Sequence, residues 1–204
     1  MPWIAVFKTI HFLLTLLYIN FFIAKHSRKM IMSCSRIFLG LGSNVEREIH
    51  LSLGLKMLEE HLINIKCSPV FKSASVDDSG PAFFNLVLSA ETDLPLEKLI
   101  LWIKEIERAH GRQIFKHKNL VTLDIDLLLY NNLVGIFNGV ELPRREIVER
   151  AYILYPLTQL APSQIHPKHG VSFSDIWHRS KIGPRLELVK HSIHSLEILA
   201  VACL

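Results

Sequence analysis

The pattern of apolar residues divides residues 36–130 into segments with the period of a strand and segments with the period of a helix. The strand-like runs are rich in β-branched, apolar and aromatic residues and end at turn residues. The predicted strands are Arg36–Asn44, Ile63–Phe71, Ala82–Glu91 and Thr122–Tyr130, and the predicted helices are Glu46–Leu62 and Pro95–Ala109. Their order is strand, helix, strand, strand, helix, strand, which is typical of the split βαβ arrangement.

This order predicts an α+β fold, a ferredoxin-like split βαβ sandwich whose mostly antiparallel sheet carries its helices on one face. The opposite face of the sheet is then free for ligands. Each helix offers the sheet an apolar stripe. The stripes are Leu51, Leu55, Leu58 and Leu62, widened by Ile49, Leu53 and Met57, and then Leu96, Leu99, Ile100, Ile103 and Ile106. In the strand Ala82–Glu91 the face with Phe84 is the predicted core face, and Pro69 marks Ile63–Phe71 as an edge strand.

The chain beyond Tyr130 has a less regular pattern. Asn131-Asn132 predicts a turn, and Pro143–Arg150 predicts a polar helix or turn. The remaining predictions are a short strand within Leu133–Leu142, an apolar strand and turn at Ala151–Pro162, a helical turn at Ser172–His178 and an unpatterned peripheral segment at Leu186–Leu204.

Gly40 and Gly42 end the first strand in a Gly-x-Gly pattern. The pattern resembles a dinucleotide fingerprint only superficially, because the third glycine and the βαβ continuation are missing. We interpret the two glycines as residues of a tight turn, with Asn44 as a candidate cap of the following helix.

Composition and charge fit one globular domain with an anionic small-molecule ligand. Half of the 204 residues are apolar, and the net charge is only +4, without a basic cluster dense enough for a nucleic-acid surface. Cys34, Cys67 and Cys203 are scattered and form no C-x-x-C pair. This spacing argues against a disulfide framework or a zinc site and favours a reducing, cytoplasmic setting.

The first 31 residues differ from the rest of the chain. Trp3–Ala24 is almost wholly apolar and is followed by a basic cluster. The segment can be a membrane anchor, a soluble helical extension or the product of a mis-called start, with Met30 or Met32 as the natural start. We therefore expect three parts: the extension 1–31, a domain at 32–180 and a peripheral tail at 181–204.

The sequence also offers a metal site, on Asp124 and Asp126. Residues two apart in a strand point to the same face, so the two carboxylates lie about 7 Å apart and repel each other unless a cation binds between them. Magnesium suits such oxygen ligands and is usually shared with substrate phosphates. The alternative is two acids on the solvent face of an edge strand. His166 and His169 also have metal-ligand spacing, but their Pro- and Gly-rich loop disfavours that reading.

With these motifs in place, residues 35–179 resemble 6-hydroxymethyl-7,8-dihydropterin pyrophosphokinases of folate biosynthesis. The shared motifs occur in order along the chain. They are FLGLGSN at 38–44, FFN at 83–85, IERAHGR at 106–112, TLDIDLLLY at 122–130, ERAYILYPLTQLAP at 149–162 and HP at 166–167.

The resemblance implies transfer of pyrophosphate from ATP to the pterin hydroxymethyl group, with release of AMP. It implies that Asp124 and Asp126 bind two magnesium ions. It also implies that Asn85 hydrogen-bonds the pterin, while Phe83 and Tyr152 bind the ring from opposite sides. The implied partners are these two small molecules, with no nucleic acid, and with a membrane only if residues 1–31 are an anchor.

On the nucleotide side the resemblance implies roles for charged residues. Arg112 corresponds to an arginine of the loop that closes over the triphosphate, and Glu107 to an acid near the nucleotide. Lys116 and Lys118 lie in the basic connection before the acidic strand, where cations would neutralise a polyphosphate. Arg144 stands where the family has a histidine near the nucleotide.

Three positions depart from the family pattern. Val121 stands in place of an arginine, for which Lys116 and Lys118 are the candidate replacements; Arg144 replaces the histidine; and Ser73-Ala74 replaces a Thr-Pro pair. Two alternatives therefore stay open: a non-catalytic pterin- or nucleotide-binding protein on this scaffold, and another magnesium-dependent nucleotidyl or phosphoryl transferase.

Overall fold

The middle strand of the sheet is β4 (Phe83–Thr92), which pairs on one side with β1 (Ser35–Ser43). Strand β1 pairs on its other side with β5 (Asp124–Tyr130). The computed structural model describes residues 34–75, 80–111, 119–183 and 186–189. All the strand pairs of this sheet are antiparallel. The molecule therefore has the predicted α+β class, with the predicted order of strands and helices up to Tyr130.

The predicted strand Ile63–Phe71 is divided into β2 (Ile63–Cys67) and β3 (Phe71–Ser73), which pair in succession with the same side of β4. Between them, Ser68 keeps contact with β4: its backbone N–H donates to the Val87 carbonyl at 2.8 Å, and its hydroxyl accepts from the Val87 N–H at 3.0 Å. The edge prediction holds for β2 but is wrong for β3.

Strand β3 lies inside the sheet because β8 (Leu186–Leu188) pairs with its outer side. The first three residues of the segment that we expected to be peripheral and unpatterned are therefore part of the sheet. Residues 190–204 lie outside the described residues.

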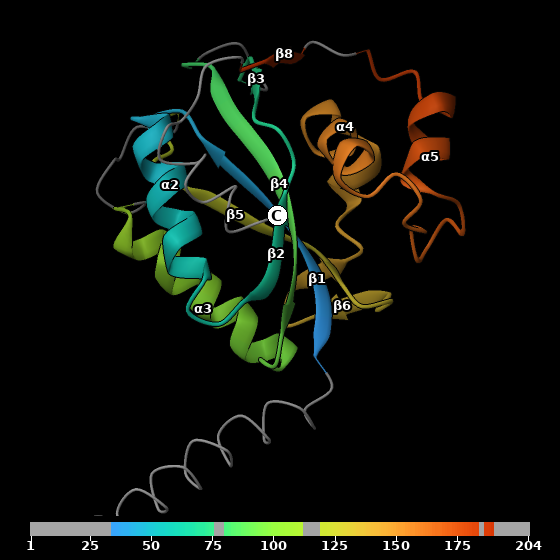
Figure 1. The fold of residues 1–204 in the computed structure, drawn as a ribbon, viewed down its shortest axis with the longest axis horizontal. Helices are drawn as coiled ribbons and strands as arrows, with labels where there is room; N and C mark the ends of the chain where they lie inside the picture. Colours follow the sequence, from blue (N-terminus) through green and yellow to red (C-terminus); the bar gives the residue numbers. More distant parts are fainter. Residues whose placement is uncertain (1–33, 76–79, 112–118, 184–185, 190–204) are drawn as a thin grey trace, which may run out of the picture. The chain divides into compact units, whose positions relative to one another are not determined.

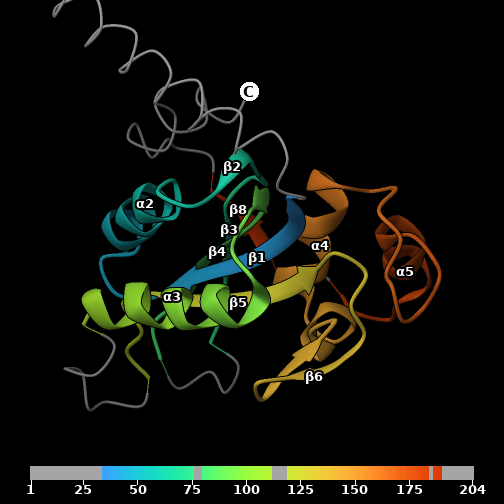
Figure 2. The ribbon, with the colours of Figure 1, turned by 90° about the horizontal axis from the view of Figure 1, so that it is seen from below.

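Helices α2 (Arg47–Leu58) and α3 (Leu96–Ala109) lie side by side over one face of the sheet (Figures 1 and 2). Their predicted stripes are buried in the main core, including Leu62 just beyond the end of α2. The widening of the α2 stripe is wrong for Ile49 and Leu53, which are 55% and 48% exposed. Each lies two residues from a buried leucine, about 200° around the helix, and so points to solvent.

The opposite face of the sheet carries a helix where we expected a strand. Ala151–Leu160 forms α4, whose buried Ile153, Leu154 and Leu157 pack on residues of β4 and β5. Spacings of three and four fit a helix, whereas the apolar run and Pro156 within it suggested a strand. Helix α4 consequently covers part of this face, as Figure 1 shows.

The remaining elements extend this second layer. Strands β6 (Gly135–Phe137) and β7 (Val140–Leu142) form a hairpin, followed by the 3₁₀ turn η1 (Arg145–Val148). Helix α5 (Phe173–Arg179) forms at the predicted helical turn, and the Ser172 hydroxyl caps it by accepting from the Asp175 N–H at 3.1 Å. Within the described ranges, no helix is both long and apolar enough to cross a membrane. The apolar extension 1–31 lies outside them.

Candidate active site

Two carboxylates of β5 point to the face of the sheet that carries α4. Asp124 and Asp126 are half-buried, while Ile125 and Leu127 between and after them are 4% and 5% exposed in the main core under α2 and α3. The alternation predicted from the sequence is therefore confirmed. Because side chains two apart in a strand share a face, both carboxylates border the same space.

Two glycines of β1 lie between these carboxylates and the neighbouring strand β4. Gly42 pairs with Asp124 on one side and Asn85 on the other, and Gly40 pairs with Asp126. A Cβ added at Gly42 would lie 3.2 Å from the Asn85 Oδ1. Our interpretation of the glycines as turn residues is wrong, because both lie within β1. Their missing side chains leave the surface open between the amide and the carboxylates.

Asn44 fixes the approach to β5 and does not cap α2. The Asn44 Nδ2 donates to the Asn119 carbonyl at 2.6 Å, and its Oδ1 accepts from the Val121 N–H at 2.6 Å. The Asn44 backbone N–H also donates to the Val121 carbonyl at 2.9 Å. The residue before α2 is Glu46, with a left-handed backbone and no side-chain cap bond. The capping prediction is therefore wrong, since the Asn44 side chain is already engaged with the chain leading to Asp124.

A small cavity of about 210 Å³ lies between these strands and the start of α4. Its lining residues are Gly40, Leu41, Gly42, Ser73, Ala74, Phe83, Asn85, Leu86, Asp124, Asp126, Tyr152 and Ile153. The Asn85 side chain is only 7% exposed, and its Nδ2 donates to the Ser73 hydroxyl at 2.9 Å. Phe83 offers a half-buried ring two residues away. The small cavity thus combines an oriented amide, an aromatic ring and two carboxylates.

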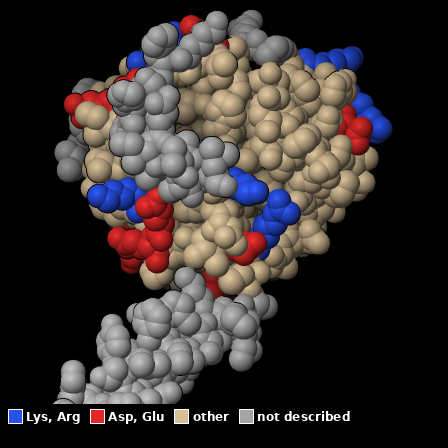
Figure 3. All heavy atoms as spheres, in the orientation of Figure 1, with Lys and Arg blue, Asp and Glu red and all other residues tan. Residues whose placement is uncertain are grey.

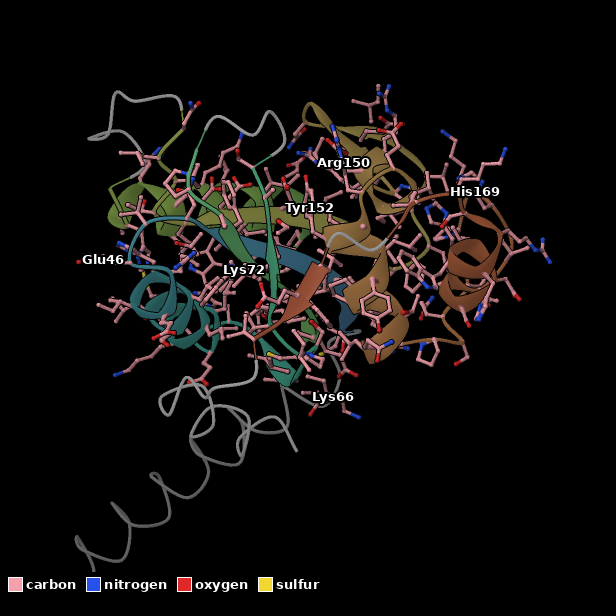
Figure 4. All side chains as sticks on the ribbon, turned by 90° about the horizontal axis from the view of Figure 1, so that it is seen from above. Glu46, Lys66, Lys72, Arg150, Tyr152 and His169 are labelled. Carbon is pink, nitrogen blue, oxygen red and sulfur yellow. The ribbon has the colours of Figure 1, made fainter. Side chains whose placement is uncertain are left out.

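Tyr152 borders the small cavity from the first turn of α4 (Figure 4). Burial is the main cause that raises the pKa of its phenol; Arg150 lowers it, and the Asp126 and Asp124 carboxylates raise it further. The phenol therefore stays neutral near pH 7 and offers a flat ring with a hydrogen-bonding group.

A large cavity of about 540 Å³ lies on the other side of the Asp126 carboxylate. Its lining residues are Ile100, Ile103, Lys104, Glu107, Arg108, Ile125, Asp126, Leu127, Val140 and Arg144. Lys104 and Arg108, four residues apart on α3, supply positive charge there. Asp126 lines both cavities, so the two cavities adjoin at this carboxylate.

Two predicted nucleotide residues, Glu107 and Arg144, line the large cavity. Glu107 is 7% exposed, and its Oε1 accepts from the Ile125 N–H at 3.0 Å, which ties α3 to β5. The Arg144 Nη2 lies 2.8 Å from the Asp126 Oδ1, and its Nε lies 3.4 Å from the Glu146 Oε2. Arg144 thus links Asp126 to a second acid, Glu146.

The structure brings Asp124, Asp126, Asn85, Phe83 and Tyr152 together at the small cavity, and Glu107 and Arg144 at the large one. Arg112, Lys116 and Lys118 lie outside the described residues.

Of the two histidines in the loop before α5, His166 is buried and His169 is exposed. His166 is 2% exposed, and its Nδ1 accepts from the Lys168 N–H at 3.2 Å. Its ring lies 4.6 Å from the His169 ring, centroid to centroid, and is tilted by 57° to it. Burial is also the main cause that lowers the pKa of His166 to about 4. Among the residues that the structure describes, no three metal-ligating side chains gather. The burial of His166 favours a packing role for that residue.

Three features of the site were not predicted from the sequence. They are the open surface at Gly40 and Gly42, the hydrogen bond between Ser73 and Asn85, and the cations of α3. Gly40 and Gly42 alternate within a strand-like run, and glycine inside a strand often marks close approach of a ligand, so that signal was present. Lys104 and Arg108 carried a weaker signal, because exposed cations four apart are common on helices. Ser73 was noted only as a departure from the family pattern; its bond to Asn85 was not predictable, because it depends on the pairing of β3 with β4.

Comparison with known proteins places the chain in a family. Residues 38–162 match the model of the family described as 7,8-dihydro-6-hydroxymethylpterin-pyrophosphokinase (HPPK). The chain is 35% identical over 134 residues to the 2-amino-4-hydroxy-6-hydroxymethyldihydropteridine pyrophosphokinase of Aquifex aeolicus, covering 64% of this chain and 83% of that protein. It is 31% identical over 136 residues to the protein of the same name from Pseudomonas aeruginosa, covering 62% and 81%.

Other relatives are much longer. The match to the folic acid synthesis protein of Pneumocystis carinii is 26% identical and covers 70% of this chain but 20% of that protein. A crystal structure of Plasmodium falciparum HPPK-DHPS aligns with a TM-score of 0.60 at 13% identity, covering 76% of this chain and 49% of the other, and it supports the fold alone. From the family match and the bacterial relatives, the chain belongs to the 7,8-dihydro-6-hydroxymethylpterin-pyrophosphokinase family and is an enzyme of the pyrophosphokinase class.

Proposed function

We propose that this chain transfers the β,γ-pyrophosphoryl group of ATP to the hydroxymethyl oxygen of 6-hydroxymethyl-7,8-dihydropterin and releases AMP, as a step of folate synthesis in the cytoplasm. The observation that carries the proposal is the place of Asp126, which lines both the small and the large cavity. A transfer between two substrates needs a site where their reacting groups meet, and this carboxylate stands at that junction.

The small cavity is the proposed pterin site. A pterin is a flat heterocycle with a polar edge, and Tyr152 and Phe83 supply rings while Asn85 supplies a buried amide. The Ser73 hydroxyl holds that amide in one orientation, so the amide loses little freedom when a ligand binds. The open surface at Gly42 lets the heterocycle lie close to the sheet.

The large cavity is the proposed nucleotide site. Its apolar part, with Ile100, Ile103 and Leu127, suits the adenine base, and Lys104 and Arg108 suit phosphate oxygens. We expect Arg112, Lys116 and Lys118 to add positive charge around the triphosphate. Glu107 acts by holding the backbone of β5, and so the carboxylates, in register with α3.

Asp124 and Asp126 are the proposed ligands of two magnesium ions. Two carboxylates on one face, beside a cavity with cationic walls, fit a metal that keeps waters and is shared with phosphates. When bound, magnesium neutralises the phosphate charge and makes the phosphorus more electrophilic. The protein's own contribution is to hold both substrates in line and to supply fixed charges.

Removal of the proton from the pterin hydroxyl does not require a strong base among the residues that line the small cavity. The titratable residues that line it are Asp124, Asp126 and Tyr152. The raised pKa of Tyr152 keeps the phenol protonated, so it binds and orients the substrate without removing a proton. Rate enhancement therefore rests on positioning and charge, as in phosphoryl transfers in general.

The test is AMP formation from ATP by the full chain at saturating magnesium, with and without 6-hydroxymethyl-dihydropterin. We expect AMP only when the pterin is present. ADP in place of AMP would indicate a different transferase. Pterin binding without any turnover would indicate the non-catalytic alternative, which Val121 and Arg144 favour as departures from the family pattern.

A further inference from the structure

Arg144 is the residue whose contacts the proposed reaction leaves unexplained. Its guanidinium contacts Asp126 at 2.8 Å, with side chains 31% and 32% exposed. A cation bonded to this carboxylate competes with a metal for it, because magnesium requires the same oxygen atoms. While this contact is made, the Arg144 guanidinium therefore neutralises part of the negative charge of the proposed metal site.

The position of Arg144 is held by its backbone, whereas its side chain has two partners. The Arg144 N–H donates to the Leu128 carbonyl of β5 at 2.9 Å, which keeps the residue beside the acidic strand. The Nε lies 3.4 Å from the Oε2 of Glu146, two residues further along the chain in η1. The guanidinium can thus leave Asp126 and keep an acidic neighbour, which lowers the cost of the change.

The large cavity gives the released guanidinium a new partner. Arg144 lines this cavity together with Lys104 and Arg108, and the proposed triphosphate would bring several acceptor oxygens to it. Arginine binds phosphate through parallel N–H···O bonds, which are stronger than a partly exposed ion pair. The incoming nucleotide therefore offers Arg144 a better partner than Asp126.

We propose that Arg144 acts as a placeholder cation at Asp126 in the free enzyme and moves to the nucleotide phosphates as the metal arrives. This inference rests on the proposed function. Its consequence is an order of binding: the free enzyme binds a divalent metal weakly, and nucleotide and metal bind tightly together. Arg144 is a positioning residue in this account, since it controls access to a metal ligand.

The test measures metal binding directly, without turnover. The full chain is titrated with Mn²⁺ as the magnesium probe, and free Mn²⁺ is followed by electron paramagnetic resonance. Arg144→Gln should tighten Mn²⁺ binding to the free enzyme about fivefold, the factor expected for loss of a partly exposed ion pair. With α,β-methylene-ATP present, the same variant should bind the Mn²⁺–nucleotide complex about tenfold more weakly, because a charged phosphate contact is lost.

The matched control is Arg145→Gln. Arg145 is the next residue, has the same charge, is 70% exposed and pairs with Glu149 at 2.9 Å, away from Asp126. It should leave both affinities within a factor of two. Arg144→Lys is the second variant, should Arg144→Gln unfold; it should tighten Mn²⁺ binding to the free enzyme by less than fivefold, since a lysine keeps the charge but only as a point charge.

Opposite changes in the two affinities of Arg144→Gln would support the placeholder role. An unchanged or weaker Mn²⁺ affinity of the free variant would overturn it, and so would an equal gain in Arg145→Gln, which would reflect net charge alone. These readouts need neither the pterin nor AMP. Failure of the proposed transfer would therefore appear as missing AMP in the wild type, while failure of this inference would appear in the Mn²⁺ titration.

Discussion

Single residues of β1 decide what the site can hold. Gly42 lies between Asn85 on β4 and Asp124 on β5, and no side chain fills the space between the amide and the carboxylate. The D-x-D pair was predictable from strand alternation, because its two members share a face whatever the fold around them. The role of Gly42 was not, because it depends on which strands flank β1, and pairing is a tertiary property.

Gly42→Ala should weaken pterin binding about tenfold, because the added Cβ would stand 3.2 Å from the Asn85 Oδ1 and displace the amide. Gly40→Ala is the matched comparison, since its Cβ would meet the Leu128 side chain at an ordinary 3.5 Å. The measurement is calorimetric titration of each variant with 6-hydroxymethyl-dihydropterin. Equal losses in both variants would contradict the special role of position 42.

Asp124→Asn and Asp126→Asn should each lower kcat/KM by a factor of about 100 to 1,000, equivalent to about 3–4 kcal/mol of transition-state stabilisation, because each removes a charged metal ligand. The assay is AMP formation at saturating magnesium. Asp93→Asn, in an exposed turn after β4, is the control and should keep its activity. Near-normal turnover in both site variants would show that Asp124 and Asp126 do not bind a metal that the reaction needs.

At the scale of elements, periodicity predicted the strands and helices of the first half well. The apolar stripes of α2 and α3 have the spacing that packing against a sheet requires, so they appear in the sequence. Helix α4 was mistaken for a strand because its run from Ala151 to Leu160 is apolar on most sides and contains Pro156. Strand β8 was not predicted, because alternation over three residues cannot be distinguished from chance.

We predict that His166, in the loop between α4 and α5, makes the free energy of unfolding depend on pH. His166 is buried and its folded-state pKa is about 4, below the ordinary 6.5. The His166 imidazole therefore binds a proton more readily in the unfolded chain than in the folded one. Its contribution to the free energy of unfolding is complete above pH 6.5 and is lost as the pH falls towards 4. The shift corresponds to about 3 kcal/mol of unfolding free energy.

Urea unfolding of the wild type and His166→Asn between pH 7.5 and 4 measures this contribution. The variant should lose less unfolding free energy than the wild type over the window from pH 6.5 to 4. His178→Asn, on the exposed side of α5, should follow the wild type. Parallel curves for all three proteins would show that His166 does not titrate as described.

At the scale of the whole molecule, the two cores lie on opposite faces of one sheet. The larger lies under α2 and α3, and the smaller joins the sheet to α4 and α5. Figure 2 shows these two pairs of helices on opposite sides of the sheet. The α4 layer forms one wall of the small cavity. On the surface drawn in Figure 3, Lys and Arg lie beside Asp and Glu, consistent with a small-molecule partner.

The family match covers residues 38–162 and so does not include the N-terminal extension. We therefore predict that a chain starting at Met32 folds with the same melting temperature as the full chain, within about 2 °C, and keeps its activity. Thermal melts and AMP assays of both chains are the measurements. A lower melting temperature or lost activity in the shorter chain would show that residues 1–31 belong to the working fold.

The most direct test of the proposed function is the ³¹P spectrum of a reaction containing the full chain, Mg²⁺, ATP and 6-hydroxymethyl-dihydropterin. Transfer of the intact pyrophosphoryl group predicts a single AMP resonance together with two coupled resonances of a pterin diphosphate, in equal amounts. A spectrum with ADP and a pterin monophosphate, or with ATP unchanged, would contradict the account.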